Sequence, residues 1–141
     1  MNTPIAAPVF VLDNPPGLYD PAPNGYSHVA AVKPGAKWLW IAGQGGETQD
    51  GILSTDFRTQ VRQALSNLKT ALASAGAGTD DVLKLTVLVV AHTEERLHVF
   101  GAELEAAFGP RHKPACTLIP VPRLALDGML FEVEAVAAVA G

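Results

Sequence analysis

The chain has 141 residues, of which 48% are hydrophobic and 17% charged, so it can bury the core of one domain and is too apolar for a disordered protein. The net charge is −4, the pI is about 5.4, and the sequence shows no cluster of lysine and arginine residues. This charge distribution argues against a nucleic-acid partner. The single cysteine excludes an internal disulfide and a cysteine-based zinc site, and neither a metal nor a cofactor is expected.

The cellular context follows from what the chain lacks. Its longest apolar runs are too short to span a bilayer, and residues 1–11 have no basic stretch of the kind that begins a signal peptide. One free cysteine is consistent with a reducing compartment. We therefore expect a cytoplasmic protein with no membrane partner.

The N-terminal part is rich in turn-forming residues. Residues 1–24 contain many prolines and asparagines and predict an irregular segment, with room for one short strand over residues 8–12. The domain proper is expected to span residues 25–141. Two apolar runs, 28–32 and 38–42, flank Pro34-Gly35 and predict a β-hairpin.

Two helices follow from apolar residues that recur every three or four positions. Ser54 or Thr55 can cap the first helix, with Asp56 near its positive end, and Gly76 is a plausible stop. Gly109-Pro110 ends the second helix. The apolar faces are formed by Phe57, Val61, Leu65, Leu68 and Leu72 in the first helix and by Leu97, Phe100, Leu104 and Phe108 in the second.

Three further apolar segments predict strands. Residues 83–90 form a nearly continuous β-branched run of the kind that is usually buried on both faces, and residues 116–121 and 129–139 predict two closing strands. The expected order is β-β-α-β-α-β-β, with an extra N-terminal strand as an option. The fold class is therefore α+β, with two helices on one face of a mixed sheet.

Four short motifs lie where these predicted strands begin or end. They are Gly25-Tyr26-Ser27, Ala42-Gly43-Gln44, Pro114-Ala115-Cys116-Thr117 and Glu132-Val133-Glu134. In this order, and with Gln60 and Asn67 on the first helix, they resemble the Rid family, the reactive intermediate deaminases once called YjgF-like. Its members are small trimeric proteins, and the best known hydrolyse reactive enamines and imines. The resemblance runs from about Gly25 to about Ala138.

The resemblance implies a chorismate-mutase-like fold and a homotrimer. Three sheets would meet in a barrel-like core, and clefts at the subunit boundaries would hold a small-molecule ligand. The apolar composition also favours an oligomer, because a small monomer hides so much apolar surface with difficulty. The alternative is a monomeric α/β sandwich.

The resemblance also assigns roles at the first two motifs. Tyr26 would line the cleft and hydrogen-bond substrate or water; the alternative is a tyrosine packed at a strand entrance with its hydroxyl in solvent. Ala42 stands where relatives have a serine and offers no hydroxyl. The amide of Gly43 would still face the ligand, and Gln44 would bond backbone groups across the turn.

The third motif departs from the family pattern. Cys116 replaces an arginine that clamps the substrate carboxylate, and Leu118 replaces a cysteine; losing the ion pair would weaken carboxylate binding by about 2–5 kcal/mol. Cys116 is either a nucleophile or a small buried residue. A nucleophile needs a nearby base such as His112, from which Pro114 separates it in the sequence.

The fourth motif supplies the candidate acid. Glu132 and Glu134 are two apart on a strand and so point to the same face. The resemblance assigns to Glu132 the orientation of water or of the substrate nitrogen, and a carboxylate in a partly apolar cleft suits proton transfer. Glu134 is expected to be structural, and a solvated strand face is the alternative for both. His28 is a minor candidate beside the cleft.

Three functions remain open. The first is hydrolytic deamination of a reactive imine, enamine or related metabolite, with Glu132 and Tyr26 positioning water and with altered substrate preference. The second is a non-catalytic ligand-binding or regulatory trimer that uses the same cleft, whose altered positions are Ala42, Cys116 and Leu118. The third is a ribonuclease-type activity, against which the acidic pI argues.

Overall fold

The computed structural model describes residues 7–141, and its elements follow the predicted order with the extra N-terminal strand present. The strands are β1 (Phe10–Asp13), β2 (Val29–Val32), β3 (Lys37–Gly45), β4 (Val82–Val90), β5 (Ala115–Val121) and β6 (Phe131–Val139). The helices are α1 (Phe57–Ser74) and α2 (Glu94–Phe108), with short 3-10 turns at Ala22–Asn24 and Thr79–Asp81.

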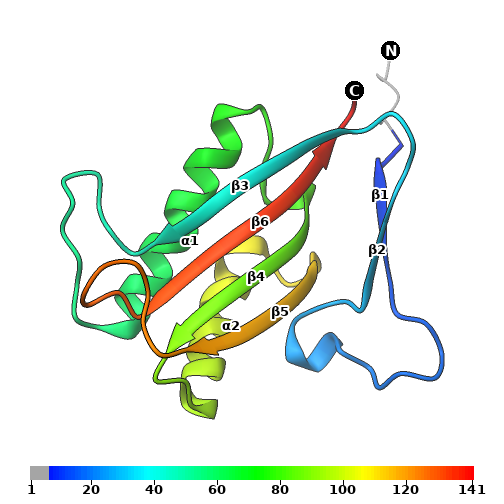
Figure 1. Ribbon diagram of the computed structural model, residues 1–141. Coiled ribbons are helices and arrows are strands. Elements are labelled where there is room, and N and C mark those ends of the chain that lie inside the picture. Colours follow the sequence, from blue (N-terminus) through cyan, green and yellow to red (C-terminus); the bar gives the residue numbers. More distant parts are fainter. Residues whose placement is uncertain (1–6) are drawn as a thin grey trace.

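The main sheet has four strands in the order β3-β6-β4-β5. Strand β6 runs antiparallel to both β3 and β4, whereas β4 and β5 are parallel, so the sheet is mixed. Helices α1 and α2 lie together on one face of it (Figure 1). The predicted α+β architecture, with two helices covering one face of a mixed sheet, is confirmed.

The predicted hairpin between residues 28–32 and 38–42 is wrong. Strand β2 pairs with β1, with Phe10 opposite Val32, and the two form a separate arm beside the main sheet (Figure 1). Strand β3 instead pairs with β6, with Lys37 opposite Val139. The nine-residue β6 matches β3 in length, whereas β2 has four residues, so β6 offers β3 the longer ladder.

Burial alternates along most of the two central strands, β6 and β4. In β6, Phe131 and Val133 are fully buried toward the helices, whereas Glu132 is half-buried and Glu134 exposed. Strand β4 alternates in the same way, so within one chain it is buried on one face only, unlike the expectation from its apolar run. The helix side of the core includes Leu85, Val87, Val89, Val61, Leu65, Leu68, Phe100 and Leu104.

The opposite face of the sheet carries no helix. Trp38 and Trp40 of β3 lie 46% and 75% exposed there, with their rings stacked at 6.2 Å between centroids. Ile119 of β5 is also exposed on this side. A sheet needs cover on both faces to hide its apolar side chains. Among residues 7–141, no helix is both long and apolar enough to cross a membrane.

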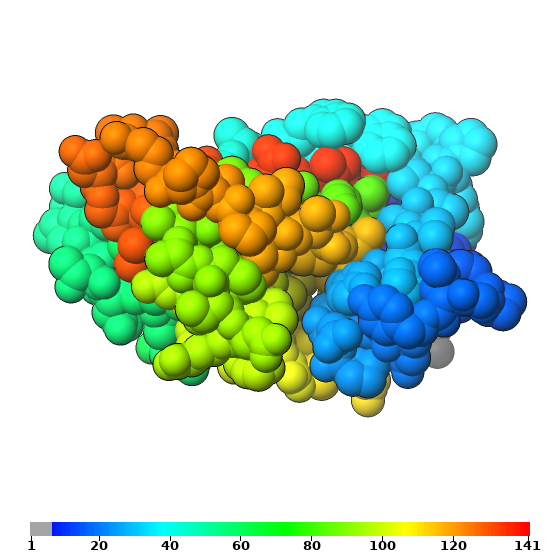
Figure 2. All heavy atoms as spheres, turned by 60° about the horizontal axis from the view of Figure 1, so that its bottom comes forward, coloured from blue at the N-terminus to red at the C-terminus, as the bar shows by residue number. Residues whose placement is uncertain are grey.

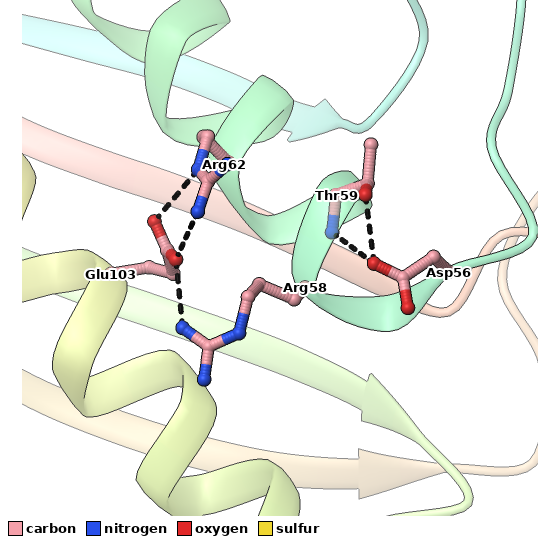
Figure 3. Close-up of polar contacts among 5 residues, drawn as sticks. All are labelled: Asp56, Arg58, Thr59, Arg62 and Glu103. Atoms are coloured by element: carbon pink, nitrogen blue, oxygen red, sulfur yellow. Dashed lines mark hydrogen bonds and ion pairs between the residues drawn. The ribbon is translucent and has the colours of Figure 1, made fainter.

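Charged contacts join the two helices (Figure 3). The carboxylate of Glu103 on α2 is 8% exposed and lies 2.8 Å from Nη1 of Arg58 and 2.9 Å from Nη2 of Arg62, both on α1. Hydrogen bonds from Arg62 and then Arg58 hold the pKa of Glu103 below its ordinary value. Asp56, and not Ser54 or Thr55, caps α1, because its carboxylate accepts the Thr59 N–H at 3.0 Å.

We expect Glu103→Gln to lower the free energy of unfolding at pH 7 by about 1–3 kcal/mol, the usual worth of charge-assisted hydrogen bonds. Because the folded pKa of Glu103 is depressed, this stabilisation is present above the ordinary pKa of 4.5 and disappears as the pH falls through the folded value. Urea unfolding at pH 7 and pH 3 measures both effects. Glu105→Gln, at an exposed position of the same helix, is the control. Equal stability of Glu103→Gln and wild type at pH 7 would contradict this role.

Candidate functional site

Glu132 lies on the face of the sheet that the helices leave open. It is the second residue of β6, opposite Gly45 of β3 and Leu88 of β4. Glu134 points to the same side, and Phe131 and Val133 point to the other, so the predicted alternation is confirmed. No hydrogen bond or ion pair joins the Glu132 carboxylate to another residue of the described part of the chain.

A bulge in β3 accommodates this carboxylate. The ladder with β6 shifts register between Ile41 and Gln44, which leaves Ala42 and Gly43 outside the regular pairing. A Cβ atom at Gly43 would overlap the Glu132 carboxylate, so a larger residue there would force this flexible side chain to move from its present position. The side-chain amide of Gln44 donates to the carbonyl of Ala42 at 3.0 Å, which matches its expected backbone-bonding role. We call Ala42, Gly43 and Glu132 the acidic half-site.

Two side-chain amides of α1, those of the buried Gln60 and the half-buried Asn67, hold the strand ends that form the acidic half-site. The Gln60 amide nitrogen donates to the carbonyls of Ser54 at 2.7 Å and Gly128 at 2.9 Å, and its oxygen accepts the Leu130 N–H at 2.8 Å. Asn67 donates to the carbonyls of Gly45 and Glu47. Gln60 thereby fixes the entry into β6, and Asn67 fixes the exit from β3.

Tyr26 belongs to a different part of the molecule. The next residue, Ser27, forms a parallel bridge with Ala115 at the start of β5, and its N–H donates to the Pro114 carbonyl at 3.2 Å. This bridge places Tyr26 and Cys116 at the same end of β5. We call Tyr26 and Cys116 the tyrosine half-site.

Two further aromatic residues surround Tyr26. The Tyr19 hydroxyl contacts the Tyr26 hydroxyl, and the His28 ring lies 5.4 Å from the Tyr26 ring, edge to face. His28 Nε2 is 2.8 Å from the Tyr19 carbonyl oxygen. Sequence reasoning missed Tyr19, because nothing distinguishes it from its neighbours in the proline-rich segment.

The two half-sites are far apart within one chain. Ala115 lies opposite Lys84, and Glu132 lies opposite Leu88, so they are four residues apart along β4, or about 13 Å at the rise of a strand. They also lie on opposite sides of β4. The structure therefore brings Ala42 and Gly43 to Glu132, but it does not bring Tyr26 or Cys116 there.

Cys116 and Leu118 point toward the helix side of the sheet, where both are partly buried against the core. Burial raises the pKa of the Cys116 thiol to about 11, although the positive charge of Lys84 opposes the shift. His112 does not activate the thiol, because its Nε2 lies 2.7 Å from the Val82 carbonyl and its ring stacks on Phe108. These contacts favour the interpretation of Cys116 as a small buried residue.

We expect Cys116 to react slowly with iodoacetamide and to show a midpoint near pH 11 in its rate profile. Two pKa units above an ordinary thiol leave about a hundredfold less thiolate at neutral pH. The same chain unfolded in urea is the control and should show the profile of a free cysteine. A midpoint below about pH 8 in the folded protein would instead indicate an activated nucleophile.

No group of three or more histidine, cysteine, aspartate or glutamate side chains within residues 7–141 is arranged to hold a metal ion. What the acidic half-site offers is one free carboxylate beside the irregular backbone of a bulge. That arrangement suits the movement of a proton on a small bound molecule.

Comparisons with known proteins agree on one family. The family model described as endoribonuclease L-PSP matches residues 19–139. A RutC family protein of Pyrococcus horikoshii, PH0854, is 37% identical over 123 residues, which cover 83% of this chain and 90% of that protein. The RutC family protein YjgH of Escherichia coli is 31% identical over 112 residues, which cover 79% of this chain and 82% of that protein. A crystal structure is known of YyfB from Yersinia pestis, a Rid family protein of unknown function that is 34% identical in sequence. It superposes on this chain with a TM-score of 0.87, and the match covers 93% of this chain and 99% of the YyfB chain.

Proposed function

The chain belongs to the Rid/YjgF family that the endoribonuclease L-PSP model describes, and on this basis we propose that it hydrolyses a reactive imine or enamine at a site shared between subunits. Glu132 and Tyr26 position the attacking water. The substrate is a small molecule whose binding does not depend on a carboxylate clamp.

The free carboxylate of Glu132, seated against Gly43 on the open face of the sheet, carries this proposal. In the proposed reaction Glu132 takes a proton from water as the oxygen bonds to the imine carbon. That proton then passes to the nitrogen, which gives a carbinolamine. Glu132 next transfers the proton of the new hydroxyl group to the nitrogen as the carbon–nitrogen bond breaks, so a carbonyl compound and a neutral amine or ammonia leave. Backbone amides at the bulge are suited to support the charge that develops on the substrate.

A homotrimer would join the two half-sites. Because Tyr26 and Glu132 lie at opposite ends of the sheet, a site that uses both needs the acidic half-site of one copy and the tyrosine half-site of the next. The open sheet face with Trp38 and Trp40 supplies apolar surface for such an assembly. The lone free thiol is compatible with a reducing compartment, and we extend the proposal to a cytoplasmic location.

The substrate preference follows from Cys116. A protonated, partly buried thiol cannot form the paired hydrogen bonds that an arginine makes with a carboxylate. Imines derived from amino acids should therefore bind worse than neutral imines, by about 2–5 kcal/mol if the carboxylate is left unpaired in a shielded cleft.

A non-catalytic ligand-binding trimer is the second candidate. The observation in its favour is that Cys116 and Leu118 pack against the core and so leave the cleft with few polar groups. A ribonuclease activity, which the name of the family model suggests, is not proposed because the net charge of −4 opposes binding of a polyanion.

We expect Glu132→Gln to reduce turnover of freshly generated imines by about 10²–10⁴-fold, the usual worth of a general base. Glu134→Gln, two residues along the same face, is the matched control and should retain activity. Release of ammonia or amine from a panel of imines with and without carboxylates measures both. Full activity of Glu132→Gln would remove this residue from the mechanism. Ligand-induced rises in melting temperature without any turnover would favour the binding protein.

A subunit-mixing experiment tests the shared site. We expect Tyr26→Phe and Glu132→Gln to be inactive alone, but isolated mixed trimers should regain roughly a third of wild-type activity, because one of the three interfaces in each mixed trimer combines two intact half-sites. Co-expression with two affinity tags isolates the mixed assemblies. No recovery in mixed trimers of confirmed composition would show that Tyr26 and Glu132 do not share a site.

A further inference from the structure

A hollow of about 550 Å³ lies between the N-terminal arm and α2. It is distant from the acidic half-site but neighbours the tyrosine half-site, because Gly25 directly precedes Tyr26 and the Ser27 hydroxyl donates to the Lys113 carbonyl. Figure 2 shows the blue residues of the arm facing the yellow-green residues of α2 across the hollow. Residues 22–25 line one side and α2 lines the other, and Gly109, His112 and Lys113 complete the lining. Hollows of this size suit small organic ligands.

One face of α2 forms the helical wall. His98, Gly101, Ala102 and Glu105 all line the hollow, and their spacing of three and four residues puts them on a single helix face. Gly101 destabilises the middle of a helix relative to alanine. Within residues 7–141, a Cβ at this position would meet no atom of another segment within 4 Å, so close packing does not require the glycine. The glycine therefore leaves the helix surface open at this point of the hollow.

The lining combines an apolar floor with charges of both signs. Leu97 is 40% exposed, and Phe100 and Leu104, which are largely buried in the core, also border the hollow. Glu105 stands near the C-terminal end of α2, where free carbonyl groups add negative potential. Lys113 also lines the hollow. Neither side chain makes a hydrogen bond or ion pair within the described part of the chain.

We propose that this hollow is a second binding site, for a small zwitterion of the amino-acid type with an apolar side chain. The ammonium group lies at Glu105 and the carboxylate at Lys113, and the apolar side chain rests on Leu97 and Leu104. The site does not depend on the function proposed for Glu132.

Calorimetric titration with L-phenylalanine, phenethylamine and 3-phenylpropionate tests the charge requirement. Phenylalanine should bind saturably, and each analogue, which lacks one charge, should bind about tenfold more weakly. Glu105→Gln should weaken binding of phenylalanine but not of 3-phenylpropionate. Lys113→Gln should weaken binding of phenylalanine but not of phenethylamine.

Filling the hollow tests its location. Gly101→Leu should lower the affinity for phenylalanine by at least about tenfold, and Gly101→Ala, which improves the helix, should lower it less. Gly78→Ala adds a side chain in open space outside the hollow and should change nothing. Unchanged binding in the folded Gly101→Leu protein would overturn the proposal, and so would no saturation at about 10 mM phenylalanine. A changed assembly mass of Gly101→Leu would also overturn it, because another copy of the chain would then be the occupant.

Discussion

The side-chain amide of Gln60 is the contact on which the acidic half-site depends. It is fully buried, and its hydrogen bonds reach three separate backbone groups, of Ser54, Gly128 and Leu130. Leaving this amide without hydrogen-bond partners in the core would lower the free energy of unfolding by about 1–3 kcal/mol. The cost keeps the three segments bonded to Gln60. Leu130 lies two residues before Glu132, and the amide therefore sets where β6 begins.

Because side chains alternate along β6, the position of its first residue decides which face of the sheet Glu132 points to. Phe131 and Val133 must face the helices to complete the core, so Glu132 must face the open side, where the bulge at Gly43 leaves room for its carboxylate. A one-residue slip would bury the carboxylate and expose the phenylalanine. Packing on the helix side thus enforces the position of the acid on the other side.

In the proposed mechanism, which uses both Tyr26 and Glu132, one chain is an incomplete site. Tyr26 is tied to β5 through the Ser27–Ala115 bridge, and Glu132 is tied to β3 through the bulge, so the rigid sheet keeps them apart. No side-chain rearrangement closes a gap along a strand of about 13 Å. The proposed trimer supplies the missing half by symmetry, and the bare sheet face beside Trp40 is what an assembled neighbour would cover.

The sequence by itself determined the order of elements, both helices and the shared face of Glu132 and Glu134, because these depend on side-chain periods within one segment. Only the tertiary structure decided that β3 pairs with β6 and that Tyr26 lies far from Glu132. It also decided that Cys116 is buried with a raised pKa. Strand pairing and burial depend on residues distant in the chain, and a local pattern of apolar residues is compatible with several partners.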